Sequence, residues 1–228
     1  MGPRDSAASR FVDRRQAGAE LASVLLHYRG RNAVVLALPR GGVPVGYEVA
    51  RQLDADLDVF VVRKLGMPGH REYAFGAIAS GGVQFLDRDV LQRYGVPDAS
   101  VEAVVREERA ELERREREYR RDTALTPLQS RTVILVDDGL ATGSTMKAAV
   151  EAVRRHDPGR VVVAVPVGAP ETCRELRTLA DEVVCMSTPE HFAAVGQWYQ
   201  DFSETSDAEV RELLNRPTRH ERGQVLIR

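Results

Sequence analysis

The stretch VILVDDGLATGST, residues 133–145, decides the fold that this sequence predicts. It contains most of an apolar run, 132–136, of the kind found in strands that are buried on both faces of a parallel sheet. Asp137 and Asp138 follow directly, so two exposed carboxylates are expected at the tip of that strand. The apolar spacing of 146–156 then predicts a helix. The segment therefore places two acids, a turn of small residues and a helix N-terminus in direct succession.

The turn between the acids and the helix has the composition of an anion-binding loop. A helix N-terminus exposes unpaired N–H groups and carries a partial positive charge. Gly143 lets an anion approach the backbone, and hydroxyl donors are added by Thr142, Ser144 and Thr145. The two carboxylates cannot hold the same phosphate because like charges repel, so they would face sugar hydroxyls or hydrated Mg²⁺. A phosphorylated ribose would satisfy the whole segment.

Two other interpretations of this segment are weaker. Asp-Asp-Gly could be a solvated turn and Thr-Gly-Ser-Thr a helix cap, but acids and a cap would normally be separate features. The acids could instead belong to a P-loop ATPase, which also requires a G-x-x-x-x-G-K-[ST] string. No such string occurs in the sequence, so this class of protein is disfavoured.

On either side of this segment, the chain alternates between short apolar runs and stretches with helical spacing. Apolar runs predict further strands at 32–38, 57–62, 160–167 and 182–186. Helices are predicted at 11–28, 43–53, 100–122, 171–180 and about 207–215. Five glycines and a proline make 63–82 a predicted loop or loose ribbon, with short strands near 74–79 and another strand at 83–86. This alternation predicts an α/β fold with a parallel twisted sheet and helices on both faces.

The segment 133–145 resembles, almost position for position, the phosphoribosyl-pyrophosphate (PRPP) signature of the type I phosphoribosyltransferases. The resemblance implies transfer of the 5-phosphoribosyl group of PRPP to a nucleobase-like acceptor, with release of pyrophosphate and with Mg²⁺ as cofactor. Asp137 and Asp138 would hold the ribose hydroxyls and would lie near a metal that is bound through PRPP and water. The residues implied in binding the 5′-phosphate are Ala141, Thr142, Gly143, Ser144 and Thr145.

Two further segments match the family's pyrophosphate site in position. Arg40 follows the first predicted strand and could donate to phosphate oxygens, together with the N–H groups of Gly41 and Gly42. Arg63 and Lys64 end the second predicted strand and would bring positive charge to the leaving pyrophosphate. A tight turn with an outward arginine, and ordinary solvation of a strand end, are the respective alternatives. The implied catalytic set is Asp137, Asp138, Lys64 and Arg40.

The stretch 65–74 stands where the family keeps a mobile flap over the reacting sugar. Its polar candidates are His70 and Arg71. A closed flap would exclude water from the cation-like C1′ atom during the transfer.

The resemblance also implies a division of the chain into a core and a hood over the acceptor. The core would span 1–186, with a helical excursion at about 88–122. The hood and C-terminal tail would span 187–228. In the hood, Phe192 and Trp198 could stack on the acceptor base, or could instead pack the C-terminal part onto the sheet.

Composition limits the classes of function. The chain has 228 residues and a formal net charge of −2, which argues against a dedicated nucleic-acid binder. No apolar run approaches the roughly 20 residues of a transmembrane helix, and the N-terminus lacks the apolar stretch of a secretory signal. Two isolated cysteines, Cys173 and Cys185, make neither a disulfide framework nor a zinc site, which favours a cytoplasmic location.

A second class of function stays open: a PRPP- or nucleotide-sensing regulator that uses the same fold without catalysis. Such a regulator usually needs a basic stripe, and the predicted helix at 100–122 is the obvious place for one. Over 102–122 the chain carries seven arginines against eight acids. This balance favours a solvated helix, or one that packs in a homodimer. PRPP and an acceptor base are therefore the expected partners, and nucleic acid and membranes are not.

Overall fold

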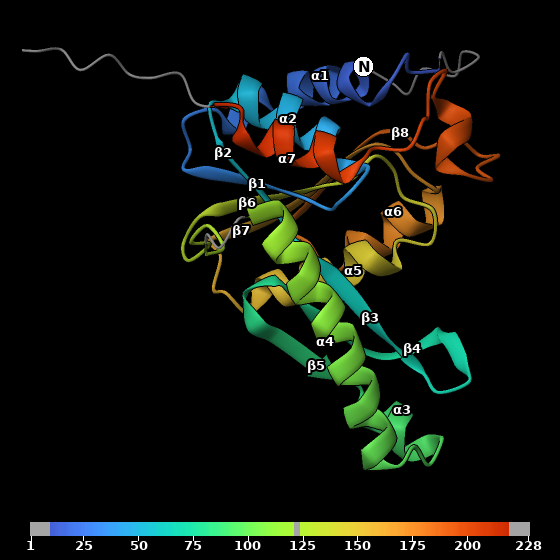
Figure 1. Ribbon diagram of the computed structural model, residues 1–228. Coiled ribbons are helices and arrows are strands. Elements are labelled where there is room, and N and C mark those ends of the chain that lie inside the picture. Colours follow the sequence, from blue (N-terminus) through green and yellow to red (C-terminus); the bar gives the residue numbers. More distant parts are fainter. Residues whose placement is uncertain (1–9, 121–123, 219–228) are drawn as a thin grey trace, which may run out of the picture.

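The structure, a computed structural model, describes residues 10–120 and 124–218. Its centre is a five-stranded parallel sheet with the strand order β2-β1-β6-β7-β8, which confirms the predicted fold class. Because all strand pairs in this sheet are parallel, the carboxyl ends of the five strands lie along one edge (Figure 1). The strands are β1 (Ala33–Ala37), β2 (Asp56–Val59), β6 (Thr132–Val136), β7 (Arg160–Val167) and β8 (Glu182–Ser187).

Helices cover both faces of the parallel sheet (Figure 1). One face packs against α1 (Arg14–Leu25) and α2 (Gly42–Leu53). The other face packs against α5 (Ser144–Arg154) and α6 (Pro170–Leu176). Successive strand residues point to opposite faces, so alternate residues of each buried strand belong to two separate hydrophobic cores.

A three-stranded antiparallel sheet stands beside the parallel one. It consists of β3 (Val62–Met67), β4 (His70–Ala79) and β5 (Val83–Leu86). The strand predicted at 83–86 is confirmed as β5. The short strand predicted near 74–79 lies within β4 and is confirmed. The loop or loose ribbon predicted for the rest of 63–82 is wrong, since β3 and β4 pair over most of this stretch.

Close packing explains why this glycine-rich stretch forms strands. A Cβ atom on Gly76 would overlap the backbone carbonyl oxygen of Phe85 on the neighbouring strand. Glycine therefore lets β4 and β5 approach each other here. Leu65 and Phe75 are fully buried in the core beneath this sheet, which supplies the hydrophobic stabilisation that a free loop would lack.

The predicted helical excursion contains two helices, α3 (Arg88–Arg93) and α4 (Asp98–Arg120). In Figure 1, α3 and most of α4 project away from the parallel sheet together with the antiparallel sheet. Arg120 anchors the C-terminal end of α4 to β2 of the parallel sheet, because its Nε donates to Oδ1 of Asp58 at 2.8 Å and both side chains are buried.

The C-terminal part of the chain returns across the molecule. Helix α7 (Asp207–Asn215) packs against α2 and α4 (Figure 1), and a parallel bridge joins Phe11 to Tyr199. The predicted helices are all present, with ends shifted by a few residues. In the described ranges no helix is long and apolar enough to span a membrane. The short 3-10 helices are η1 (Leu26–Tyr28), η2 (Ser80–Gly82) and η3 (Val195–Trp198).

Candidate active site

The acid pair, Asp137 and Asp138, lies at the tip of β6. One carboxylate oxygen of each residue accepts a hydrogen bond from another group of the protein. Oδ1 of Asp137 accepts a hydrogen bond from the backbone N–H of Asp138 at 2.9 Å. Oδ2 of Asp138 accepts one from Nε of Arg14 at 2.8 Å. In the part of the chain that the structure describes, the other two oxygens, Oδ2 of Asp137 and Oδ1 of Asp138, accept no hydrogen bond from another residue. Two adjacent acceptors are therefore available to a ligand.

The acids are less exposed than the sequence predicts. Both are half-buried, and the Asp138 side chain is 13% exposed in its ion pair with Arg14. The expectation of exposed carboxylates is wrong because α1 and the turn at Gly41 close over the strand tip. Burial raises the pKa of Asp137 well above its ordinary value, and the charge of Asp138 adds to the rise. Burial also raises the pKa of Asp138, although the Arg14 guanidinium opposes this effect.

The predicted phosphate loop leads into the N-terminus of α5. Gly143 caps this helix with a φ of 66°, a left-handed conformation that favours glycine. The N–H groups of the first helical turn, from Ser144 to Met146, have no acceptor within the helix. The hydroxyl oxygens of Thr142 and Ser144 lie 3.3 Å apart beside them. This geometry provides backbone and hydroxyl donors to an anion at one point.

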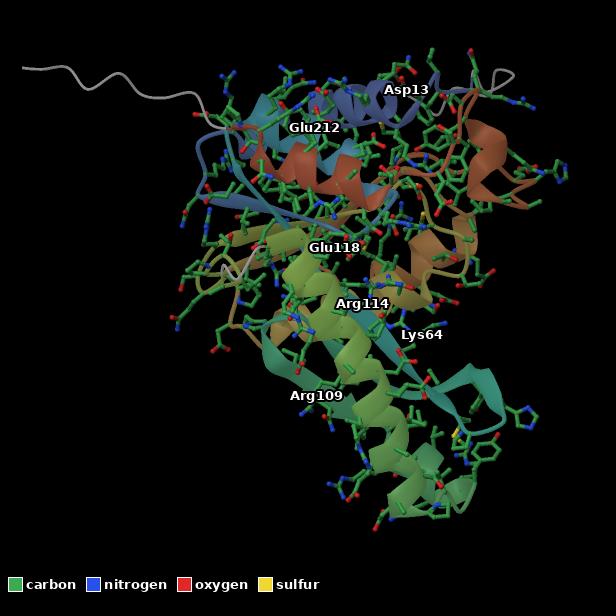
Figure 2. All side chains as sticks on the ribbon, viewed as in Figure 1. Asp13, Lys64, Arg109, Arg114, Glu118 and Glu212 are labelled. Atoms are coloured by element: carbon green, nitrogen blue, oxygen red, sulfur yellow. The ribbon has the colours of Figure 1, made fainter. Side chains whose placement is uncertain are left out.

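Lys64 lies at this loop rather than at the end of a strand of the parallel sheet. It belongs to β3, and its Nζ donates to Oγ of Ser144 at 3.3 Å. Figure 2 shows Lys64 near the middle of the molecule, on β3. Arg63 points to the opposite face of the strand, where its Nη2 pairs with Oε2 of Glu108 on α4 at 2.6 Å. The structure therefore brings Lys64 to the phosphate loop and does not bring Arg63 there.

The glycine turn after β1 packs directly on the acid pair. A Cβ atom on Gly42 would lie 2.8 Å from the carbonyl oxygen of Val136, and one on Gly41 would overlap Oδ2 of Asp138. The N–H of Gly42 donates to the Leu38 carbonyl at 3.0 Å, so it is not available to a ligand. The N–H of Gly41 has no acceptor among the described residues. Of the two N–H groups predicted to bind pyrophosphate, only that of Gly41 is therefore free to bind an anion.

Arg40, which is joined to Pro39 by a cis peptide bond, forms ion pairs with the C-terminal segment. Its guanidinium pairs with Glu204 and lies 3.9 Å from Oδ2 of Asp207. The hydroxyl of Tyr119 donates to the same Asp207 at 2.6 Å. Arg40 directly precedes Gly41, which packs on Asp138, and the charge of Arg40 is balanced by the protein itself.

The hood candidates lie in one aromatic cluster. Phe192 and Trp198 are half-buried and pack with the buried side chains of Phe11 and Tyr199. The indole N–H of Trp198 is buried without an acceptor among the described residues. Packing of the C-terminal part onto the sheet accounts for this cluster, and stacking on a base stays a prediction.

Three residues near the acid pair escaped prediction from the sequence. Arg14 holds Asp138, and the hydroxyl of Tyr199 donates to the backbone carbonyl of Asp138 at 2.6 Å. The guanidinium of Arg14 stacks on the ring of Phe202, with its Cζ 3.9 Å from the ring centre. None belongs to a local motif, so only the fold shows that they are neighbours of the acid pair.

The predicted flap forms the turn between β3 and β4. His70 is the first residue of β4, where it pairs with Met67. The side chain of Arg71 lies outside the described part of the structure. The stretch 65–74 is therefore a hairpin in this state.

The free carboxylate oxygens, the donors of the α5 N-terminus and the ammonium of Lys64 together define the class of site. This arrangement has the donors and acceptors that a phosphorylated ligand with hydroxyl groups requires, and it lies beyond the carboxyl end of a strand of a parallel sheet. Comparison with known proteins identifies the family: the chain belongs to the family described as phosphoribosyl transferase domain, whose model matches residues 69–202.

Several relatives are similar over most of the chain. A Mycobacterium tuberculosis H37Rv protein named "Putative phosphoribosyl transferase Rv0571c" is 48% identical over 209 residues, which are 92% of this chain and 47% of that protein. Its counterpart in strain CDC 1551, MT0597, matches equally well. The chain thus spans about half the length of these curated relatives. The crystal structure of TT1426 from Thermus thermophilus has a TM-score of 0.82 and 47% identity, and covers 90% of this chain and 97% of that chain.

Proposed function

We propose that this protein transfers the 5-phosphoribosyl group of PRPP to a nucleobase-like acceptor and releases pyrophosphate. The observation that carries this proposal is the pair of unoccupied oxygens on Asp137 and Asp138, next to the donors at the N-terminus of α5. Adjacent acceptors suit the 2′- and 3′-hydroxyls of a ribose. The donors suit its 5′-phosphate, and family membership supports the same ligand.

In the proposed complex, the phosphate loop provides binding energy away from the reacting atom. The loop, 141–145, holds the 5′-phosphate, and Lys64 adds positive charge through its place beside Ser144. The acids orient the ribose so that C1′ faces the acceptor. Binding of these remote groups lowers the barrier because it fixes the geometry of the reacting centre in advance.

The proposed reaction breaks the bond between C1′ and a pyrophosphate oxygen and forms a bond from C1′ to an acceptor nitrogen. C1′ becomes cation-like during the exchange, as in other glycosyl transfers. The negative charge of Asp137 and Asp138 favours that cation. Arg40 and the free N–H of Gly41 stabilise the charge that grows on the leaving pyrophosphate. For Arg40 to do so, the pyrophosphate must replace Glu204 as its partner.

The donor set fits a Mg²⁺ ion that arrives with the substrate. In the described residues no cluster of three or more acidic, histidine or cysteine side chains could hold a metal ion. Mg²⁺ usually keeps several waters and binds through substrate phosphates and one or two carboxylates. The free oxygens of Asp137 and Asp138 suit contact with such a hydrated ion through water. Bound Mg²⁺ would supply neutralisation of the pyrophosphate charge.

On the acceptor side, Phe192 and Trp198 are proposed as stacking residues. Both are half-buried, so part of each ring stays accessible to a planar base. Phe192→Ala should then weaken acceptor binding far more than PRPP binding. A loss of equal size in both would identify Phe192 as a purely structural residue.

A screen of nucleobases with PRPP and Mg²⁺, in which pyrophosphate release is followed, tests the proposal. Release with one or a few bases supports it. Tight PRPP binding without release for any base would favour the PRPP- or nucleotide-sensing regulator instead. The arginines of α4 do not form a free basic stripe, so a nucleic-acid target has little support. Four of the six pair with acids of the same helix: Arg114, Arg115, Arg117 and Arg120.

We also propose a cytoplasmic location, because both Cys173 and Cys185 are free thiols. A homodimer is proposed with α4 as its contact, and an experiment in solution, such as sedimentation, would test it. Neither proposal affects the assignment of the acid pair.

A further inference from the structure

Arg14 joins three parts of the molecule that are far apart in the sequence. It is the first residue of α1, and its side chain is 12% exposed. Its Nε donates to Oδ2 of Asp138 at 2.8 Å, and its Nη1 donates to the carbonyl oxygen of Ser203 at 2.6 Å. The guanidinium also stacks on the ring of Phe202. One side chain therefore links α1, the tip of β6 and the C-terminal segment 199–205.

The ion pair between Arg14 and Asp138 determines which carboxylate oxygen of Asp138 can accept a hydrogen bond from a ligand. A carboxylate at a strand tip can rotate, but a charge-assisted hydrogen bond to one oxygen holds it in one orientation. With Oδ2 held by Arg14, Oδ1 is the oxygen that is left without a partner among the described residues. The guanidinium is itself held at Ser203 and Phe202, so its own orientation is fixed as well.

The C-terminal segment contacts the site at further points. The hydroxyl of Tyr199 donates to the backbone carbonyl of Asp138 at 2.6 Å. A few residues on, Glu204 and Asp207 pair with Arg40. The segment thus touches both the strand that carries the acids and the turn after β1. If it moved away from α1, Arg14 would lose two of its three contacts.

We propose that Arg14 is a positioning residue: it holds Asp138 with Oδ1 turned toward the sugar, and it makes this orientation depend on the docking of segment 199–205 against α1. The inference rests on the proposed function, because it takes the ribose of PRPP as the ligand of the acid pair. Sugar binding and the docking of the segment are then linked, and each stabilises the other.

Calorimetric titration with PRPP and Mg²⁺ tests the role of Arg14. Arg14→Gln removes the ion pair and should raise the Kd for PRPP about tenfold or more, as expected for loss of a hydrogen bond between charged groups. Arg14→Lys keeps the charge but cannot bind Asp138 and Ser203 at once, so it should restore part of the affinity. The matched control is Arg15→Gln, since Arg15 is 56% exposed and pairs with Glu48 instead. Its Kd should equal that of the wild type.

Two measurements separate positioning from a general loss of structure. In the wild type, PRPP should slow the hydrogen exchange of the backbone amides in 199–205, and Arg14→Gln should abolish this effect. Phe202→Leu removes the ring on which the guanidinium stacks, together with the contact of that ring with Tyr199, and should raise the Kd for PRPP about threefold. In steady-state assays, Arg14→Gln should raise the KM for PRPP more than it lowers kcat.

The outcomes are distinguishable from failure of the proposed function. A wild type that does not bind PRPP refutes both the proposed function and the role of Arg14. A wild type that binds PRPP, together with a folded Arg14→Gln variant of equal affinity, overturns the role of Arg14 alone. If Arg14→Gln does not fold, Arg14→Lys and Phe202→Leu decide the question, because unchanged Kd values in both would overturn the inference.

Discussion

Gly41 and Asp138 are packed so closely that no side chain fits between them. A Cβ atom on Gly41 would overlap Oδ2 of Asp138, lie 2.8 Å from its Cγ and lie 3.3 Å from Nε of Arg14. The turn after β1 therefore rests on the acids at the tip of β6, the strand beside it in the sheet. The glycine at this position is explained by contact with the acid pair, whatever anion the turn binds.

Gly41→Ala should displace the Asp138 carboxylate from Arg14. We expect the affinity for PRPP to fall about tenfold, equivalent to about 1.4 kcal/mol. The free energy of unfolding should fall by about 1–3 kcal/mol, because the added methyl group strains a packed site. Calorimetric titration and urea unfolding measure the two effects.

Gly30→Ala is the control for this variant. Gly30 has a φ of 76°, which disfavours alanine, but its Cβ would meet nothing within 4 Å. It should lower stability without changing the affinity for PRPP. Wild-type affinity in Gly41→Ala would show that the contact between Gly41 and Asp138 has no part in ligand binding.

The double variant Asp137→Asn, Asp138→Asn should lose measurable binding of PRPP and keep its fold. Asparagine has nearly the same shape, but it lacks the charge that strengthens hydrogen bonds to sugar hydroxyls and attracts a hydrated cation. Calorimetric titration in the presence of Mg²⁺ measures the binding, and circular dichroism checks the fold. Unchanged affinity in a folded double variant would refute the assignment of the ribose to these acids.

Asp137 should give the ligand-free protein an unusual dependence of stability on pH. Burial and the charge of Asp138 raise its pKa above the ordinary 3.8, so the folded state binds the proton more tightly than the unfolded state does. The stabilising contribution of this group is complete below the unfolded pKa, and it is lost as the pH rises through the folded pKa. At neutral pH the charged form therefore opposes folding.

Asp137→Asn should accordingly raise the free energy of unfolding at pH 7, because asparagine carries no charge to bury at this position. Asparagine retains an oxygen that can accept from the N–H of Asp138, so the hydrogen bond is kept. The gain should shrink as the pH is lowered toward 4. Urea unfolding at several pH values provides the measurement, and a variant less stable than wild type at pH 7 would contradict the prediction.

Much of the fold could be predicted because the parallel strands are continuous apolar runs. The failure over 63–82 has a physical cause: glycine-rich composition indicates a loop, whereas Gly76 packs against the backbone of Phe85 where β4 pairs with β5. Small residues such as Ala74 and Ala77 also weaken the hydrophobic alternation that marks a strand. Packing between the strands, which a sequence pattern does not express, decides the structure of this stretch.

The candidate site could be predicted only where it is local in sequence. Asp137, Asp138 and the loop 141–145 form one continuous segment after a buried strand, and the fold keeps them together. Arg14 lies 124 residues from Asp138, and it reaches the acids only because α1 packs on α2 beside the sheet. No spacing rule connects residues that tertiary packing alone makes neighbours.

Arg120→Met should destabilise the protein strongly. Nε of Arg120 donates to Oδ1 of Asp58 at 2.8 Å, and Nη1 pairs with Oε1 of Glu116 at 2.6 Å. Removal of the guanidinium leaves the buried Asp58 charge without this partner, which costs about 3–5 kcal/mol. Urea unfolding should show this loss, and adding Asp58→Asn to the variant should recover part of it. No recovery in the double variant would mean that packing, rather than the unpaired charge, causes the loss.

Lys64→Gln should weaken the binding of ribose 5-phosphate more than that of pyrophosphate. The resemblance to the family implies a contact of Lys64 with the leaving pyrophosphate, but its Nζ lies 3.3 Å from Oγ of Ser144 in the phosphate loop. Lys64 has no carboxylate partner among the described residues, so its charge is available to an anion. Loss of a charged donor to a phosphate should raise the Kd of ribose 5-phosphate about tenfold.

Arg63→Gln is the matched control, because it removes the same charge one residue away on the opposite face of β3. Arg63 pairs with Glu108 on α4, so its loss should leave the binding of both ligands unchanged. Competition of each ligand with PRPP provides the measurement. If Lys64→Gln affected pyrophosphate alone, Lys64 would have to turn away from Ser144 in the complex and act on the leaving group. If Arg63→Gln affected either ligand, the pair with Glu108 would have to open on binding. The two variants therefore decide whether Lys64 or Arg63 binds a phosphate group, and whether that group belongs to ribose 5-phosphate or to pyrophosphate.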